Sequence, residues 1–205
     1  MKLYYLPGAC SLAAHIVLEW LGKPYETHQV ERDKLKSPEF LAVNPLGAVP
    51  VLAEGDWILT QNAAILEYLA EQAPASLGLL GDGGARSRAE VRRWLGFVNS
   101  DVHRTFSLVF APQRFVQEPA AQEELRASAA ARLRELYALA DRQLGATPFL
   151  AGQRPSIADP YLYVTLRWAQ AKSLDLPGLA NLPRFMAAMN ADPGVQAALK
   201  AEGLQ

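Results

Sequence analysis

Cysteine is almost absent from this chain of 205 residues, which contains one, Cys10. A single cysteine excludes an internal disulfide and a Cys-x-x-Cys dithiol motif. Histidine is also scarce, with three copies, and none of them lies at metal-ligand spacing from Cys10 or from another histidine. We therefore expect no metal site, and any sulfur chemistry of the protein itself must depend on Cys10.

The chain also lacks a large charge of either sign and any long hydrophobic run. Its formal net charge of −1 argues against a general nucleic-acid binder, which would need a basic face. Half of its residues are hydrophobic, yet no window approaches the apolar length of a membrane span. The first residues have the pattern of a strand and not the series of charged region, apolar run and cleavage site that marks a secretory signal, so we expect no such signal. These features predict a cytoplasmic protein that binds neither nucleic acid nor membranes.

The first 22 residues carry the most informative pattern. An apolar run suited to a strand, Leu3 to Leu6, breaks at Pro7-Gly8, and Cys10 follows at the start of an amphipathic helix. Gly22 supplies a left-handed end for that helix. First-turn N–H groups and the helix dipole favour a thiolate at such a position, either that of Cys10 or that of a bound thiol. The alternative is a buried cysteine that acts as a small hydrophobic residue.

The chain divides into two parts by composition. Residues 1–80 alternate strand and helix signals in the order βαβαββα, which indicates a compact α/β domain. The stretch from Pro74 to Gly84 is rich in glycine, proline and serine, and we place the boundary there. Residues 86–205 are helical throughout, so the second domain is expected to be all-α.

Local signals predict where several helices begin. Ser37-Pro38 predicts a hydroxyl cap with proline in the first turn, and Asn62 predicts the cap of a helix that buries its apolar face. A long helix is expected over roughly Ala120 to Leu144, since that stretch is rich in good helix formers. Ser156-Ile-Ala-Asp159 is similar to a capping box with aspartate in the usual glutamate place.

Two segments of the first domain suit a peptide-like ligand. Val49-Pro50 directly precedes the hairpin that we expect over residues 51–59. If the Val49-Pro50 peptide bond is cis, the Val49 backbone can pair with a ligand as an added strand would. The alternative is an ordinary loop proline with a trans bond. Gln61-Asn62 places two amides at a helix N-terminus, where N–H groups suit a carboxylate. Simple N-capping by Asn62 is compatible with that role.

The first helix of the second domain carries a small and polar face opposite its apolar stripe. Gly96, Ser100 and His103 recur at i, i+4 and i+7, which places them together on a regular α-helix. A lone histidine is usually solvated or satisfied within the fold. Here the small residues beside His103 leave room for a ligand to approach it.

Taken together, these motifs resemble glutathione S-transferases. The resemblance rests on the first eleven residues, on Asn44-Pro-Leu-Gly-Ala-Val-Pro50, on Gln61-Asn62 and on Ser156-Ile-Ala-Asp159, and it extends to the closing Ala201-Glu-Gly-Leu204. The Pro-Gly-Ala-Cys-Ser setting is similar to that of the bacterial beta class. The resemblance implies a thioredoxin-like first domain, an all-helical second domain that forms the electrophile site, and a homodimer.

The resemblance also implies roles for individual residues. Cys10 would face the glutathione sulfur, with Ser11 beside it and His103 reaching in from the second domain. Val49 and Pro50 would meet the cysteinyl backbone of glutathione, and Gln61 and Asn62 its γ-glutamyl end. Lys34 would bind the glycyl carboxylate, a role for which Lys36 is the competing candidate. Ser100 and Asp101 would lie near the ligand, with the Asp101 carboxylate serving the site of the partner subunit.

The implied activity is attack of the glutathione thiolate on a small hydrophobic electrophile held near Phe106, Phe110 and Trp168. Tyr5 is a further hydroxyl candidate, although packing is the role we expect for it. The thiolate of Cys10 could instead exchange with a glutathione disulfide. A third alternative is a non-catalytic ligand carrier or interaction module, because a fold does not determine a function.

Overall fold

The computed structural model describes all 205 residues and contains one mixed sheet beside a set of helices. Four strands, β1 (Lys2–Tyr5), β2 (Glu26–Gln29), β3 (Val51–Glu54) and β4 (Trp57–Thr60), lie in the order β2-β1-β3-β4. β1 and β2 are parallel, whereas β3 is antiparallel to both β1 and β4. This βαβαββα arrangement confirms the predicted α/β unit with a thioredoxin-like topology.

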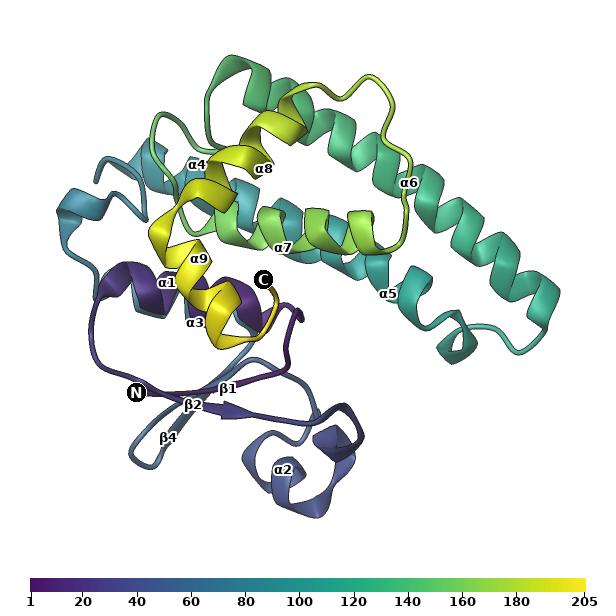
Figure 1. The fold of residues 1–205 in the computed structure, drawn as a ribbon, viewed down its shortest axis with the longest axis horizontal. Coiled ribbons are helices and arrows are strands. Elements are labelled where there is room, and N and C mark those ends of the chain that lie inside the picture. Colours follow the sequence, from purple (N-terminus) through teal and green to yellow (C-terminus); the bar gives the residue numbers. More distant parts are fainter.

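Helices cover both faces of the sheet. α1 (Ser11–Leu21) and α3 (Asn62–Glu71) pack on the face that carries Leu3, Tyr5 and Leu52 (Figure 1). α2 (Pro38–Val43) follows a short 3-10 helix at Arg32–Lys36 and buries Phe40 against Val51 on the opposite face. Strand residues alternate between the faces, so neighbouring positions belong to different layers.

Two of the predicted helix signals are confirmed in detail. The Ser37 side chain accepts a hydrogen bond from the Phe40 N–H at 3.3 Å, with Pro38 in the first turn of α2. Gly22 ends α1 with φ of 63°, a conformation that glycine adopts without the steric cost of a Cβ. The third signal is corrected. Gln61, not Asn62, occupies the cap position of α3, and Asn62 is the first helical residue, with its side chain directed elsewhere.

The regular elements after residue 84 are all helices, as expected. The elements are α4 (Ala85–Gly96), a π-helix at Phe97–His103, α5 (Arg104–Phe110), α6 (Pro119–Ala146), α7 (Ala158–Ala171), α8 (Asn181–Ala191) and α9 (Pro193–Ala201). A shorter 3-10 turn follows α5 at Pro112–Arg114. None of these helices has the length and apolar character that crossing a membrane requires.

The π-helix changes one expectation of the sequence. Its i→i+5 hydrogen bonds widen the turn, so the α-helical spacing that grouped Gly96, Ser100 and His103 does not apply. Ser100 is exposed on an outer groove, whereas His103 packs against the rings of Tyr161 and Trp168. The predicted common face is therefore wrong. Single-turn π segments occur frequently at functional sites.

One apolar core joins the sheet layer to the helices. α1 packs against α3 on one side and against α7 and α9 on the other, so it lies between the two parts of the chain (Figure 1). A single cluster of 42 buried hydrophobic residues runs from Leu3 to Leu199. The loop that precedes α1 therefore lies where both parts of the chain meet.

The start of α7 is fixed by a buried capping network. Asp159 accepts hydrogen bonds from the Ser156 N–H at 2.7 Å, from the Ser156 hydroxyl at 2.8 Å and from the Leu150 N–H at 2.8 Å. Burial nevertheless raises the pKa of Asp159 to about 6. The predicted capping box is present, and it also ties the 147–152 loop to α7.

We expect Asp159→Ala to lower the free energy of unfolding by at least about 3 kcal/mol, because it leaves three buried donors without an acceptor. Ser156→Ala removes a smaller part of the network and should cost about 1 kcal/mol. Urea denaturation measures both. Ser128→Ala on the exposed face of α6 is the control and should stay within about 0.5 kcal/mol of the wild type. Equal losses for Asp159→Ala and Ser128→Ala would contradict the assignment.

Candidate functional site

The loop between β1 and α1 brings the Cys10 side chain against a second loop. Cys10 occupies the cap position of α1, and its Sγ donates to the Val49 carbonyl oxygen at 3.2 Å. The peptide bond between Val49 and Pro50 is cis. The Val49 N–H makes no hydrogen bond within the chain, so this residue keeps a free backbone donor beside the sulfur.

Burial decides the protonation of Cys10. The N–H groups of Cys10 and Ser11 favour the thiolate, as the helix position predicts, but burial outweighs them and raises the pKa of Cys10 to about 12. The Glu202 carboxylate adds a smaller effect in the same direction. In the protein without a ligand, Cys10 is therefore a neutral thiol and a hydrogen-bond donor, which leaves a bound thiol as the candidate for the thiolate at this position.

Ser11 contributes to the loop through its side chain. Its hydroxyl is fully buried, accepts from the Leu6 N–H at 3.2 Å and donates to the Leu6 carbonyl at 3.2 Å. Both bonds hold the turn between β1 and α1. The part of Ser11 that is directed at the Cys10 sulfur is its backbone N–H.

Asn62 connects α3 to the same loop. Its Nδ2 donates to the Cys10 carbonyl at 3.1 Å, while its Oδ1 is buried without a hydrogen-bond partner. Gln61, just before it, is exposed and has φ of 73°, which is unusual for a residue with a Cβ. Strained residues of this kind cluster at ligand-binding sites. The first N–H groups of α3 and these two amides thus lie next to the Cys10 loop.

The C-terminal helices hold the loop from the other side. The Gly8 N–H donates to Glu202 Oε2 at 2.9 Å, and the Gly8 carbonyl accepts from the Trp168 indole N–H at 2.7 Å. Glu202 Oε1 also lies 2.9 Å from His15 Nδ1, and both of these side chains are almost fully buried. Both polar groups of the Gly8 peptide are therefore positioned by residues beyond position 160.

His103 and Tyr161 form a polar pair inside the helical part. His103 Nδ1 lies 2.5 Å from the Tyr161 hydroxyl, which also donates to Asn99 Oδ1 at 3.1 Å. Burial lowers the pKa of His103 to about 4, so its imidazole is neutral at physiological pH. The sequence did not point to Tyr161 as a site residue. Its only signal was a buried phenol, which usually needs a hydrogen-bond partner.

An aromatic wall extends outward from this pair. Trp168 packs edge-to-face against His103, Phe106 and Phe110, with ring centroids between 4.9 and 5.4 Å apart. Phe106 is fully buried, whereas Phe110 is 43% exposed. The Lys172 ammonium lies over the Phe110 ring at 5.6 Å. The wall therefore ends in a solvent-accessible aromatic surface.

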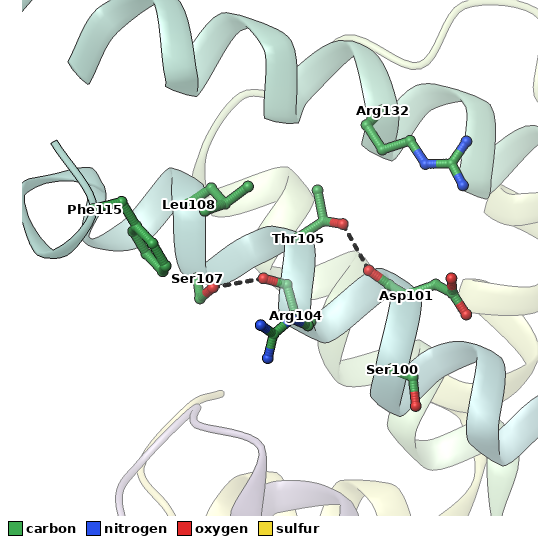
Figure 2. A pocket seen from close by; sticks show the side chains of 8 residues that line it. All are labelled: Ser100, Asp101, Arg104, Thr105, Ser107, Leu108, Phe115 and Arg132. Atoms are coloured by element: carbon green, nitrogen blue, oxygen red, sulfur yellow. Dashed lines mark hydrogen bonds between the residues drawn. The ribbon is translucent and has the colours of Figure 1, made fainter. Parts of the chain in front are cut away.

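Ser100 and Asp101 lie apart from His103, in a groove of about 380 Å³ between α5 and α6. Figure 2 shows Arg104 and Ser100 pointing away from α6 while Arg132 projects from it, and it marks the bond from the Thr105 hydroxyl to the Asp101 carbonyl. Arg132 is paired with Glu135 at 2.8 Å, and the Asp101 carboxylate shares the groove. Lys34 is exposed, and its competitor Lys36 donates to the Leu46 carbonyl at 2.6 Å. No cluster of three or more potential metal ligands is present.

The sequence and the fold both match known proteins. Family models for the glutathione S-transferase N-terminal and C-terminal domains match residues 8–72 and 119–195. Glutathione S-transferase GST-4.5 of Xanthomonas campestris pv. campestris is 52% identical over 204 residues, with both chains covered completely. This chain belongs to the glutathione S-transferase family.

Solved structures of other glutathione S-transferases have the same fold. The enzyme from Xylella fastidiosa superposes with a TM-score of 0.96 at 50% identity, covering 100% of this chain and 99% of that one. A sphingomonad glutathione S-transferase complexed with glutathione superposes with a TM-score of 0.87 at 38% identity, and both chains are fully covered. The family and the fold expected from the sequence are therefore confirmed.

The raised pKa of Cys10 in this glutathione S-transferase predicts how the thiol reacts with iodoacetamide. We expect the alkylation rate of the folded protein to keep rising with pH beyond about 10, whereas the urea-unfolded chain should level off above about 8.5. Mass spectrometry reports on Cys10 alone because the chain has no other cysteine. Glu202→Gln should shift the folded profile to lower pH, and a plateau near pH 7 in the wild type would contradict the assignment.

Proposed function

We propose that the chain is a beta-class-like glutathione transferase that binds reduced glutathione and activates its thiol for attack on an electrophile. The observation that carries the proposal is the meeting of three segments at Cys10, where Val49 contacts the sulfur and Asn62 contacts the carbonyl. Reduced glutathione is a peptide-like thiol with carboxylates at both ends, which suits a free backbone donor beside a helix N-terminus.

The glutathione contacts follow from these positions. We propose that the Val49 N–H and carbonyl pair with the cysteinyl backbone beside cis-Pro50, as an added strand would. The exposed Gln61 and the first N–H groups of α3 would take the γ-glutamyl carboxylate, and Lys34 the glycyl carboxylate. Ser100 and Asp101, which lie on the outer groove, would serve the site from a second subunit.

Activation of the glutathione thiol requires only a few interactions. A thiol of pKa about 8.5 is a few per cent ionised at pH 7, and lowering its pKa by about 2 units takes about 2.7 kcal/mol of preferential thiolate stabilisation. The dipole of α1 supplies up to about 1 kcal/mol, and each hydrogen bond to the charged sulfur about 1.5–3 kcal/mol. The Cys10 thiol and the N–H groups of Cys10 and Ser11 are suitable donors.

The electrophile would lie against Trp168 and Phe110, with the buried ring of Phe106 behind them. Trp168 binds the carbonyl of Gly8, two residues before Cys10, so this wall begins beside the sulfur site. Flat apolar surfaces of this kind bind aromatic and alkyl groups. The glutathione sulfur would then form a bond to the electrophilic carbon while a leaving group or an electron pair departs from it.

Conjugation is favoured over disulfide exchange through Cys10. Exchange needs the Cys10 thiolate as nucleophile, and a pKa of about 12 leaves very little of it at neutral pH. The same neutral thiol is a hydrogen-bond donor, which suits a role in stabilising the thiolate of glutathione. His103, kept neutral, can offer a ring nitrogen as a hydrogen-bonding group near the site.

We also propose a homodimer, a cytoplasmic location and a division into domains at residues 1–80 and 86–205. Exposed apolar side chains on β4 and α6, including Trp57, Ile58 and Leu139, suit burial in a subunit interface. Light scattering after size exclusion tests the dimer, and a monomer at micromolar concentration would refute it.

Calorimetric titration with reduced glutathione tests the binding proposal. We expect saturable binding of one glutathione per subunit, and we expect Asn62→Ala to weaken it by about tenfold, because the loop of Cys10 loses its link to α3. Asn190→Ala, on the far end of α8, is the control and should bind as the wild type does. The absence of heat up to millimolar glutathione would eliminate the transferase assignment.

Replacing the cysteine separates the two reactions. We expect Cys10→Ala to retain conjugation of glutathione to an aromatic halide within about tenfold of the wild type, since one donor among several is lost. Reduction of a mixed glutathione disulfide should be absent in the variant. Complete loss of conjugation in Cys10→Ala would contradict the role of Cys10 as one donor among several. Glutathione binding without turnover of either substrate would instead indicate a ligand carrier.

A further inference from the structure

Tyr161 is a buried phenol that lies between the two parts of the candidate site. It is on the first turn of α7, directly after the capping network at Asp159, and only 1% of its surface is exposed. Its oxygen contacts His103 Nδ1 at 2.5 Å and Asn99 Oδ1 at 3.1 Å, both on the π-helix. Rigid surroundings of this kind keep a hydroxyl within a small volume.

The same phenol is close to the groups that surround the sulfur. Burial raises the pKa of Tyr161, and the charge of a Cys10 thiolate raises it further, whereas the Asn62 side chain acts in the opposite direction. Packing contacts also connect the phenol to the sulfur loop. Trp168 packs against His103 with ring centroids 4.9 Å apart, and its indole N–H donates to the Gly8 carbonyl, two residues before Cys10. Asn62, which donates to the Cys10 carbonyl, has a buried Oδ1 without a partner. No hydrogen bond joins Tyr161 to Cys10 itself.

Tyr161 has one proton and several acceptors around it. In the ligand-free protein the Tyr161 O–H donates a hydrogen bond to Asn99 Oδ1. The neutral His103 can donate a hydrogen bond to the phenol oxygen through its Nδ1–H. Rotation about the C–O bond can redirect the O–H without moving the ring. Because its pKa is raised, the phenol stays protonated at every working pH and keeps its O–H as a donor.

Tyr5 does not offer an equivalent donor. Its hydroxyl donates weakly to Gln29 Oε1 at 3.4 Å on β2, and the ring is buried in the core beneath the sheet. Packing is therefore its role, as expected. Among the tyrosines, Tyr161 is the one whose hydroxyl contacts His103, which packs against the Trp168 that binds the Gly8 carbonyl.

We propose that the Tyr161 hydroxyl donates a hydrogen bond to the glutathione thiolate and is a catalytic residue of this enzyme. The inference rests on the proposed glutathione site. When the bound thiol ionises, its proton leaves to solvent, the Tyr161 O–H turns from Asn99 toward the sulfur, and Tyr161 keeps its own proton. The titratable groups that face the phenol are the Cys10 thiol and the His103 imidazole.

Tyr161→Phe removes the hydroxyl and keeps the ring. We expect the pKa of bound glutathione, followed by the ultraviolet absorbance of its thiolate across pH, to rise by about one unit. The value of kcat/KM at neutral pH should fall about tenfold, with the pH profile displaced by the same amount. Glutathione affinity for the protonated thiol should change little.

Tyr163→Phe is the matched control. Tyr163 lies on the same helix, is fully buried, and donates to Asn190 Oδ1 at 2.6 Å, so it loses a comparable hydrogen bond away from Cys10. The thiol pKa in Tyr163→Phe should equal that of the wild type. Asn99→Ala should lower the pKa of the bound glutathione thiol, which is opposite to the effect of Tyr161→Phe. The reason is that the Tyr161 O–H loses its acceptor in Asn99 and becomes free to donate to the sulfur.

The outcomes separate the two proposals. Bound glutathione that ionises with the same pKa in wild type, Tyr161→Phe and Asn99→Ala would overturn the role of Tyr161 and leave the transferase assignment intact. A wild-type protein that binds no glutathione would overturn both. Should Tyr161→Phe fail to fold, an Asn99→Ala thiol pKa at or above the wild-type value would still overturn the proposal.

Discussion

The Gly8 peptide is the point at which the two parts of this molecule hold each other. Its N–H is bound by Glu202 and its carbonyl by Trp168, and both partners come from the last fifth of the chain. Glu202 is itself buried against His15, with 2.9 Å between its Oε1 and His15 Nδ1. The conformation of the loop that carries Cys10 therefore depends on the C-terminal helices being in place.

That constraint also determines the electrostatics of the site. Packing of the loop against the C-terminal helices leaves Cys10 only partly exposed, and the loss of hydration outweighs the helix N–H groups that favour a thiolate. The negative charge of Glu202 acts in the same direction. The site is therefore built from neutral donors, a cysteine thiol, a phenol and amide groups, which can stabilise a negative charge that arrives with a ligand.

Much of the fold was predictable because its signals are local. The Gly22 helix end, the Ser37 cap, the hairpin after Pro50 and the Ser156–Asp159 box each depend on a few adjacent residues. The errors arose where a distant contact or an irregular turn intervened. The π-helix at Phe97–His103 separated Ser100 from His103, and the carbonyl of Cys10 engaged the side chain that was expected to cap α3.

The sequence by itself determined the order of elements, the family, and the residue types at the candidate site, because hydrophobic periodicity and cap chemistry act over a few residues. Tertiary structure alone decided the protonation of Cys10, the fixing of Gly8 by Glu202 and Trp168, and the place of Tyr161 beside His103. Burial and contacts between residues more than fifty positions apart arise only when the helices pack on the sheet, and no local pattern encodes them.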